Sequence, residues 1–397
     1  MAKLTLNDVD FNGKTVLMRV DFNVPIKDGV ITDDNRIVQA LKSIRTVVEG
    51  GAKLILTSHL GRPADAPDPE FSLKPVADHL AKLVDVPVHF AEDCVGPKRS
   101  KVVDAAKAGE IILCENVRFH PGEKKNDPEF AKQLAEGADL FVNDAFGSSH
   151  RAHASVAGVT EYIQPSVSGF LLEKEIRYLE ESVNNPERPF VAILGGAKVS
   201  DKIGVIENLL SKVDTILIGG GMTYTFYKAK GLPIGNSLLE EDKVDLAKEL
   251  MEKAEKAGVN FMLPIDSVIA KEFKNEAEND VVDEDGIEDG WMALDIGPQT
   301  IIAYSNQIKN ARTVLWNGPM GVFEMSNFAE GTFEVARALA EATKLGATTI
   351  IGGGDSSAAI KQAGLSEEVS HVSTGGGASL EYLEGKELPG VAALTDK

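Results

Sequence analysis

The sequence predicts an α/β protein with two domains, each built around a parallel β-sheet. Short apolar runs alternate with helical stretches along most of the chain, which is typical of parallel sheets covered by helices on both faces. The residues that follow these runs change from arginine and histidine in the first half to glycine in the second half. At 397 residues the chain also exceeds the roughly 250–300 residues at which a single hydrophobic core stops growing.

The composition is that of a soluble globular protein, with 43% hydrophobic and 26% charged residues. A formal net charge of −20 argues against nucleic acid or an anionic membrane as a partner. No apolar run approaches the roughly 20 residues of a membrane span, and the first residues lack the apolar core of a signal peptide. Neither Cys94 nor Cys114 stands in a CxxC motif or has a histidine at metal-ligand spacing, so we interpret both as reduced packing residues. We therefore expect a cytoplasmic protein.

In the first half, four apolar runs are each followed by a polar cluster, and three helical stretches lie between them. The runs are Thr15–Val20, Lys53–Thr57, Glu110–Cys114 and Ala138–Val142, and the helical stretches are Ile37–Glu49, Lys74–Leu83 and Pro128–Glu136. Ligands of open parallel sheets bind beyond the carboxyl ends of the strands. The polar clusters at those ends are residues 19–23, 57–62, 115–120 and 143–153.

Each cluster supplies arginine or histidine, and in a parallel sheet all four clusters should lie along one rim, the edge formed by the carboxyl ends of the strands. Seven of the eleven arginines and six of the seven histidines lie in residues 1–170. The planar guanidinium fork suits phosphate and carboxylate, so the first half is expected to bind a small anion. A single such cluster could be a solvated loop, and His150 with His153 could form a metal pair, although no carboxylate or cysteine stands at a fitting spacing. Asp21 and Asn23 could hydrogen-bond a ligand or cap the following turn.

A helix over residues 170–186 separates the two halves. Leu172, Ile176, Leu179 and Val183 line one stripe, and the Asn-Asn-Pro sequence at 184–186 should end the helix because proline cannot continue its hydrogen bonds. We interpret this helix as a strut between an N-terminal domain (1–169) and a C-terminal domain (187–379). It could equally be an ordinary crossover helix within one domain.

The second half repeats the alternation with glycine-rich loops. Its runs are Phe190–Leu194, Thr215–Ile218, Asn260–Leu263, Thr313–Trp316 and Thr348–Ile351, and the loops include residues 195–202, 219–221, 317–319, 352–356 and 374–377. Glycine after a parallel strand lets backbone amides and a helix N-terminus approach a phosphate, which predicts a nucleotide site. Glycine at these turns could instead serve only tight packing. The P-loop motif and the dinucleotide fingerprint are both absent from the sequence.

Seven blocks of the sequence resemble the phosphoglycerate kinase family, in family order and across nearly the whole chain. They are Arg19–Pro25, Ser58–Pro63, Glu115–Phe119, Gly195–Lys202, Leu315–Glu324, Gly352–Asp355 and His371–Ala378. The resemblance implies reversible phosphoryl transfer between 1,3-bisphosphoglycerate with ADP and 3-phosphoglycerate with MgATP. It also implies two Rossmann-like domains joined by a hinge helix, a monomer, and a C-terminal tail (about 380–397) that packs back on the first domain.

The resemblance also implies roles for individual residues. The substrate would be bound by Asp21, Asn23, Arg36, His59, Arg62, Arg118 and Arg151. The nucleotide would be bound by Lys198, Lys202, Ala293, Asn317, Glu324, Gly352, Gly353, Gly354, Asp355 and Ser356. Asp355 would hold Mg²⁺, directly or through water, and Arg36 and Lys198 would stabilise the transferred group. The chain departs from the common family pattern at Ala293, where glycine is usual, and at Ser356, where threonine is frequent.

Without the resemblance, two other classes stay open. One is a two-lobed protein that clamps a small anion without chemistry, since such proteins also hinge between α/β lobes. The other is a nicotinamide-dependent dehydrogenase, which the missing fingerprint opposes.

Overall fold

The computed structural model describes residues 2–397, and the chain divides into two compact units. Unit 1 comprises residues 1–176 together with Glu387–Lys397, and unit 2 is Arg177–Lys386. The division falls inside helix α6 (Phe170–Asn184), which ends where the Asn-Asn-Pro sequence predicts. Within residues 2–397, none of the helices combines the length and the apolar character that crossing a membrane requires.

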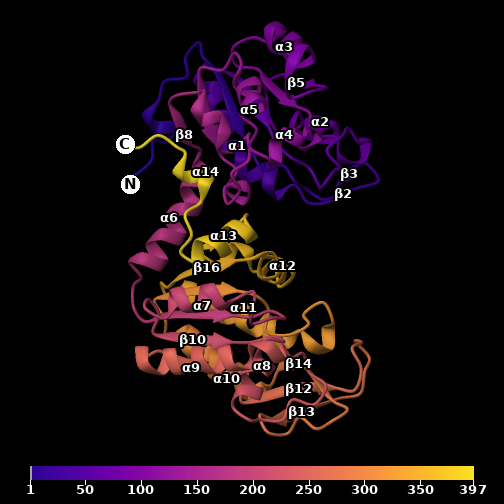
Figure 1. The fold of residues 1–397 in the computed structure, drawn as a ribbon, viewed down its shortest axis with the longest axis vertical. Helices are drawn as coiled ribbons and strands as arrows, with labels where there is room; N and C mark the ends of the chain where they lie inside the picture. The colour runs from indigo at the N-terminus through magenta and orange to yellow at the C-terminus, as the bar shows by residue number, and fades with distance from the viewer. Residues whose placement is uncertain (1) are drawn as a thin grey trace. The chain divides into compact units, whose positions relative to one another are not determined.

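Unit 1 contains a six-stranded parallel sheet in the order β5-β6-β4-β1-β7-β8 (Figure 1). The strands are β1 (Thr15–Arg19), β4 (Lys53–Thr57), β5 (Val88–Ala91), β6 (Ile111–Cys114), β7 (Leu140–Asn143) and β8 (Ser166–Ser168). The four strands expected from apolar runs are confirmed. The two edge strands escaped prediction because β5 contains a histidine and β8 is a short run of Ser-Val-Ser. A two-residue hairpin, β2 (Ile26–Lys27) with β3 (Val30–Ile31), leads into the first helix.

The helices of unit 1 bury both faces of this sheet. They are α1 (Asn35–Glu49), α2 (Lys74–Leu80), α3 (Gly96–Ala105), α4 (Pro121–Lys124) and α5 (Pro128–Ala135). On one face, alternate residues such as Val16 and Met18 of β1 pack against Ile37 and Ile44 of α1 in a continuous hydrophobic core. Helix α3 was not predicted because it has no apolar stripe. Its buried residue is Arg99, whose guanidinium donates hydrogen bonds to carbonyl groups at the end of α5.

The C-terminal segment packs on unit 1. Helix α14 (Pro389–Ala392) and the residues after it lie beside β8 (Figure 1). Thr395 bridges two parts of the unit: its carbonyl accepts the Leu4 N–H at 2.9 Å, and its own N–H donates to the Ser166 carbonyl at 2.9 Å. The preceding helix, α13 (Gly376–Leu383), begins within the glycine triplet.

Unit 2 contains a second six-stranded parallel sheet, in the order β11-β10-β9-β15-β16-β17. Its strands are β9 (Phe190–Leu194), β10 (Thr215–Ile218), β11 (Asn260–Met262), β15 (Thr313–Asn317), β16 (Thr348–Gly352) and β17 (His371–Val372). Besides α13, its helices are α7 (Ile203–Leu209), α8 (Thr223–Ala229), α9 (Val244–Ala257), α10 (Pro298–Lys309), α11 (Glu330–Lys344) and α12 (Gly354–Gln362). Ile193 and Trp316 of the sheet pack with Tyr304 of α10 and Leu339 of α11 in one core.

A three-stranded antiparallel sheet is added to unit 2. It consists of β12 (Asp266–Ala270), β13 (Asn279–Asp283) and β14 (Met292–Ile296), in the order β13-β12-β14. These strands were not predicted, because polar and acidic residues interrupt their apolar character. The α/β class and the two parallel sheets are therefore confirmed, with this small sheet as an addition.

Candidate active site

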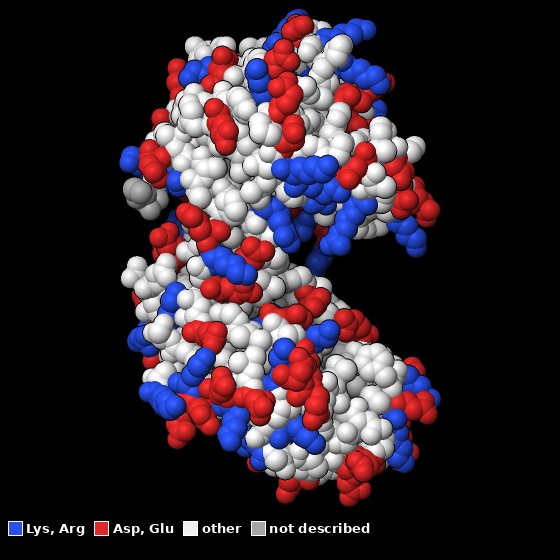
Figure 2. All heavy atoms as spheres, viewed as in Figure 1, with Lys and Arg blue, Asp and Glu red and all other residues white. Residues whose placement is uncertain are grey.

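Arginine and histidine side chains gather at the carboxyl ends of the unit 1 strands. Arg19 ends β1, His59 follows β4, Arg118 follows β6 and His153 follows β7. Figure 2 shows blue Lys and Arg side chains gathered on part of the surface of this unit. Because β4, β1 and β7 are neighbours in one parallel sheet, these residues converge on one edge, as the sequence predicts.

Asp21 is the acidic residue beside which two arginines, Arg36 and Arg19, and the imidazole of His59 lie. Its Oδ1 accepts a hydrogen bond from Arg36 Nη1 at 3.1 Å and lies 4.0 Å from His59 Nδ1. Burial alone would raise the pKa of Asp21, but the guanidinium groups of Arg36 and Arg19 hold it below its ordinary value. Asp21 is thus ionised, and it fixes the guanidinium of Arg36 from one side.

Asn23 and Arg118 are both tied to the tight turn at Gly61. Asn23 Oδ1 accepts the Gly61 N–H at 2.8 Å, and Arg118 Nη1 donates to the Gly61 carbonyl at 2.7 Å. Gly61 has φ +61°, and a Cβ there would lie 2.3 Å from the ring of Phe71, so only glycine fits this turn. The structure therefore brings Asp21, Asn23, His59 and Arg118 together, and the Asn23 oxygen serves the protein's own backbone.

Arg62 and Arg151 are exposed at the same edge. Arg62 follows Gly61 and is close enough to Arg118 to contribute to the lowering of its pKa, whose main cause is burial. Arg151 is two residues from His153, whose pKa falls to about 4 through burial and the nearby charges of Arg19, Arg118 and Arg151. Positive charge at this edge exceeds the negative charge beside it, which favours a bound anion.

Arg19, which the sequence places in the rim that binds the anion, lies beneath the site instead, together with Ser155 and Glu123, two residues that were not predicted. Arg19 is fully buried; its Nε donates to Ser155 Oγ at 2.8 Å and its Nη2 lies 3.1 Å from His59 Nδ1. Ser155 Oγ in turn donates to Glu123 Oε1 at 2.6 Å, and its N–H donates to Oε2 at 2.9 Å. Since Arg19 is always a donor, His59 Nδ1 accepts, and the ring proton is assigned to Nε2.

Burial keeps this imidazole neutral. It lowers the pKa of His59 well below its usual range, an effect that Arg19, Arg118 and Arg36 reinforce and Asp21 opposes. His59 Nε2–H is then a neutral hydrogen-bond donor rather than a cation. No pattern in the sequence links Glu123 with Arg19, because the two residues lie on different elements far apart along the chain.

The glycine loops of unit 2 lie at the carboxyl ends of adjacent strands, and several of the glycines serve loop packing. A Cβ on Gly195 would lie 2.0 Å from the Pro319 carbonyl oxygen, and one on Gly318 would lie 2.2 Å from the Gly195 carbonyl oxygen. Gly220, with φ +71°, would clash with the backbone of Gly196. At these three positions glycine is required because the loops pack closely against one another, and not because a ligand approaches. Gly354, by contrast, has nothing within 4 Å of an added Cβ.

The loop from Gly352 to Ser356 leads into α12. Gly353 precedes the helix with φ +97°, a conformation that favours glycine, and the first-turn amides of the helix have no partner within it. Asp355 is exposed, whereas Ser356 is fully buried and its Oγ accepts the Gly318 N–H at 2.6 Å. The Ser356 hydroxyl therefore joins two glycine loops.

Lys202 and Asn317 form the polar centre of these loops. Lys202 Nζ donates to Asn317 Oδ1, and burial lowers the pKa of Lys202 to about 8 although Asp201, Asp355 and Glu384 oppose the change. Asn317 Nδ2 is buried, and among residues 2–397 no hydrogen-bond acceptor for it is found. A buried ammonium beside an unsatisfied N–H group is suited to an anionic ligand.

The other expected nucleotide residues lie on different segments. Lys198 is exposed in the loop after β9, and Glu324 is exposed in the loop after β15. Ala293 lies on β14, where it is buried in a cluster with Tyr224, Tyr227 and Ile269. The contacts that join Lys202, Asn317, Gly318 and Ser356 do not include these three residues.

Comparison with known proteins identifies the family. The family model described as phosphoglycerate kinase matches residues 6–386. The chain belongs to the phosphoglycerate kinase family. Phosphoglycerate kinases are phosphotransferases with a carboxyl group as acceptor. They catalyse a reversible step of glycolysis, in which a phosphoryl group passes from 1,3-bisphosphoglycerate to ADP and yields 3-phosphoglycerate and ATP.

Similar proteins cover the whole chain. A phosphoglycerate kinase of Chloroherpeton thalassium is 59% identical over 396 residues, and one of Thermosipho africanus is 58% identical over 398 residues. These matches cover 100% of this chain and 100% and 99% of the two relatives. The solved phosphoglycerate kinase of Coxiella burnetii superposes with a TM-score of 0.89 at 43% identity, covering 98% of both chains. That of Pyrococcus horikoshii OT3 does so with a TM-score of 0.84 at 34% identity and the same coverage.

The lowered pKa of Lys202 predicts proton uptake for any nucleotide phosphate that binds beside this side chain. At a pH slightly above 8 much of Lys202 is neutral in the free protein, and an adjacent phosphate favours the charged form and raises its pKa again. MgADP binding should therefore take up protons at that pH, and affinity should fall as pH rises further. Calorimetry in buffers of different ionisation enthalpy measures the uptake. The Lys202→Arg variant, which cannot deprotonate, should show none, and equal uptake in both proteins would contradict the assignment.

Proposed function

We propose that the cationic edge of unit 1 binds the glycerate substrate and that the glycine loops of unit 2 bind the nucleotide. The observation that carries this proposal is an excess of positive charge at one sheet edge in a chain of net charge −20. On the substrate side, Arg36, Arg62, Arg118 and Arg151 pair with the carboxylate and phosphate groups. His59 donates from Nε2, and Asp21 and Asn23 position Arg36 and the Gly61 turn.

On the nucleotide side, we propose that Lys202 and the loop from Gly352 to Ser356 bind the phosphates. The buried ammonium, the unsatisfied Asn317 Nδ2 and the open first turn of α12 support this assignment. Lys198 would reach the transferred group, Glu324 the ribose hydroxyls, and Ala293 would lie near the adenine. Ala293 is 7% exposed, so only a small part of it is available for such a contact.

Asp355 is the proposed ligand of Mg²⁺. Its carboxylate is exposed and acts electrostatically on Lys202, so it lies beside the proposed phosphate site. Magnesium needs only one or two carboxylates besides phosphate oxygens and water, which fits a single aspartate. The ion would neutralise charge on the nucleotide phosphates, while Lys202 and the amides of α12 orient them.

The chemistry proposed is direct in-line transfer. In the direction of ATP synthesis, an oxygen of the ADP β-phosphate attacks the acyl phosphate, and the bond from phosphorus to the carboxyl oxygen breaks. The attacking oxygen is already anionic, so no general base is assigned. Catalysis then consists of positioning and of neutralising charge on the three equatorial oxygens, which we assign to Arg36 and Lys198.

Because the two ligands are assigned to different units, we propose that transfer requires the units to close about α6. Closure excludes water, strengthens the electrostatic interactions and limits hydrolysis. Small-angle scattering tests this step: the radius of gyration should decrease when 3-phosphoglycerate and MgADP are both bound. An equal decrease with either ligand alone would contradict it.

We also infer that the protein acts as a monomer in the cytoplasm, without nucleic-acid or membrane partners. The net charge of −20 supports the exclusion of polyanionic partners. Sedimentation equilibrium at the mass of one chain is the expected result for the oligomeric state.

A coupled assay with 3-phosphoglycerate and MgATP tests the proposed function as a whole. The expected result is formation of 1,3-bisphosphoglycerate and ADP in equal amounts. Binding of 3-phosphoglycerate without turnover, and without affinity for MgADP, would instead indicate a protein that only clamps an anion.

A further inference from the structure

Asp93, Cys94 and His120 meet at the edge of the unit 1 sheet. Asp93 and Cys94 follow β5, and His120 follows β6 and a short 3-10 turn (Val117–Phe119). Strands β5 and β6 are parallel neighbours, so the segments that leave their carboxyl ends lie side by side. The sequence analysis could not detect this group, because the histidine is remote from the cysteine along the chain.

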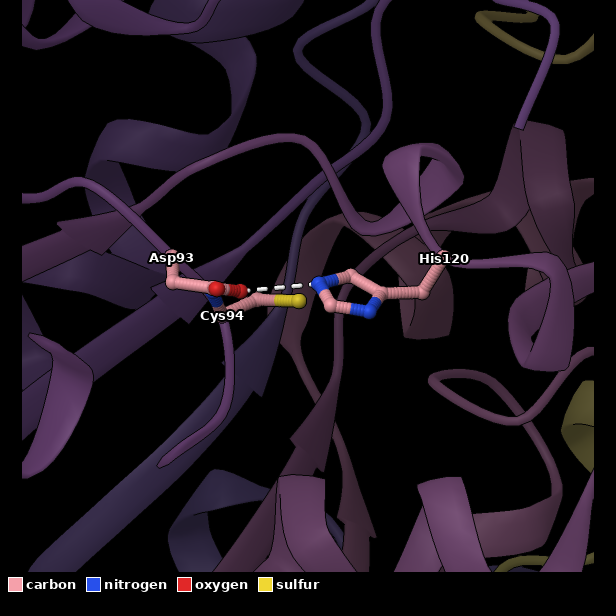
Figure 3. A group of neighbouring side chains, drawn as sticks. All are labelled: Asp93, Cys94 and His120. Carbon is pink, nitrogen blue, oxygen red and sulfur yellow. Dashed lines mark hydrogen bonds and ion pairs between the residues drawn. The ribbon is translucent and has the colours of Figure 1, made fainter. Parts of the chain in front are cut away.

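The three side chains present ligand atoms of different kinds to one point. A carboxylate oxygen, the Sγ and an imidazole nitrogen all lie within 4.8 Å of one another. Figure 3 shows the Cys94 thiol and the Asp93 carboxylate both directed at the imidazole ring of His120. His120 Nε2 lies 2.8 Å from Asp93 Oδ1, so these two groups already share a hydrogen bond.

Neighbouring groups hold each ligand in place. Asp93 Oδ1 accepts the N–H of Cys94 at 2.8 Å and that of Val95 at 3.4 Å, and Cys94 is almost fully buried. The ring of His120 stacks on Phe130, with ring centroids 5.0 Å apart and an interplanar angle of 26°. Side chains fixed by such outer contacts need little rearrangement to bind a metal.

We propose that Asp93, Cys94 and His120 form a binding site for one zinc ion. Carboxylate, thiolate and imidazole are the three ligand types that zinc accepts in four-coordinate sites. The side chains of His120 and Asp93 are 31% and 34% exposed, so water can reach the fourth position. On binding, the proton between His120 Nε2 and Asp93 is lost, so that Nε2 and the carboxylate each bond to the metal while Nδ1 carries the one proton of the neutral ring. The Cys94 thiol releases its proton to solvent.

The ligand chemistry separates this site from the magnesium proposed beside the nucleotide. Mg²⁺ requires oxygen ligands in octahedral geometry, so a set with sulfur and nitrogen disfavours it. Zinc should therefore bind to unit 1 in the presence of Mg²⁺ and without nucleotide. The alternative is that the three residues form a hydrogen-bonded structural cluster only, with no affinity for zinc.

Cobalt spectroscopy on the full-length, chelator-treated protein distinguishes these alternatives. Co²⁺ bound to a thiolate gives a charge-transfer band in the near ultraviolet, and one equivalent of Zn²⁺ should abolish it. The Cys94→Ser variant should lose the band, and its zinc affinity should fall by about 10-fold or more. The matched control is Cys114→Ser, which removes another buried thiol, one that does not belong to the group of three ligand atoms. This variant should keep the band and the affinity.

A second variant protects the test against misfolding. His120→Asn changes a side chain that is partly exposed, and it should also lower zinc affinity, as measured by competition with a chromophoric chelator. Circular dichroism and 3-phosphoglycerate binding establish that each variant is folded. No band in the wild type, or a band that persists in folded Cys94→Ser, overturns the proposal. Should Cys94→Ser fail to fold, unchanged zinc affinity in His120→Asn overturns it.

Discussion

Replacing Arg36 with alanine is expected to lower the turnover number by about 10²–10³-fold, the loss typical of removing one preorganised donor to a developing charge. Arg36 Nη1 is fixed by Asp21 Oδ1 at 3.1 Å and by the Asn23 carbonyl at 3.1 Å. Its guanidinium therefore need not reorganise as charge develops on the transferred group. The coupled assay at saturating concentrations of both substrates measures the effect. The Lys198→Ala variant should lose turnover by a factor in the same range.

Arg45→Ala is the matched control. Arg45 lies on the same helix, is exposed, and donates to the Leu83 carbonyl at 2.9 Å, so its removal should leave turnover nearly unchanged. A variant at Arg36 with normal turnover and only a raised KM for 3-phosphoglycerate would mean that the residue binds ground state and transition state equally. That result would contradict its assignment as catalytic.

Replacing Glu123 with glutamine is expected to lower the free energy of unfolding by about 3–5 kcal/mol, as when one partner of a buried charged network is removed. Glu123 and Arg19 are both fully buried and are linked through Ser155. Without the carboxylate, Arg19 keeps its charge with less compensation, and His59 loses part of the support that orients it. Urea denaturation measures the stability, and the KM for 3-phosphoglycerate should rise as well.

Glu129→Gln provides the comparison for this prediction. Glu129 is exposed in the first turn of α5, where a substitution should change stability by no more than about 0.5 kcal/mol. A loss at Glu123 as small as that at Glu129 would show that the buried network contributes little to stability.

A feature of the fold or the site could be predicted where the residues that form it are close together in the sequence. The strands β1, β4 and β9 are short apolar runs with a polar or glycine-rich sequence after them, so both the strands and the residues at their ends could be predicted. Strand β5 could not, because His89 interrupts a run of four residues at the sheet edge. Residues such as His59 were found because they directly follow a strand.

Features that depend on contacts between remote segments escaped prediction. Arg19 and Ser155 are hydrogen-bonded although 136 residues separate them in the sequence. The group of Asp93, Cys94 and His120 joins two loops that only the pairing of β5 with β6 brings together. The glycines show a further limit. The same residue type permits loop packing at Gly195 and leaves open space at Gly354, and only the positions of neighbouring atoms distinguish the two uses.

The central claim is that substrate and nucleotide are bound by different units, and paired calorimetric titrations test it most directly. Titrating Arg36→Ala and Lys202→Ala each with 3-phosphoglycerate and with MgADP should give a crossed result. Arg36→Ala should lose affinity for 3-phosphoglycerate and keep that for MgADP, whereas Lys202→Ala should do the reverse. If either substitution lowers the affinity for both ligands to a similar extent, the assignment of the two ligands to separate units is contradicted.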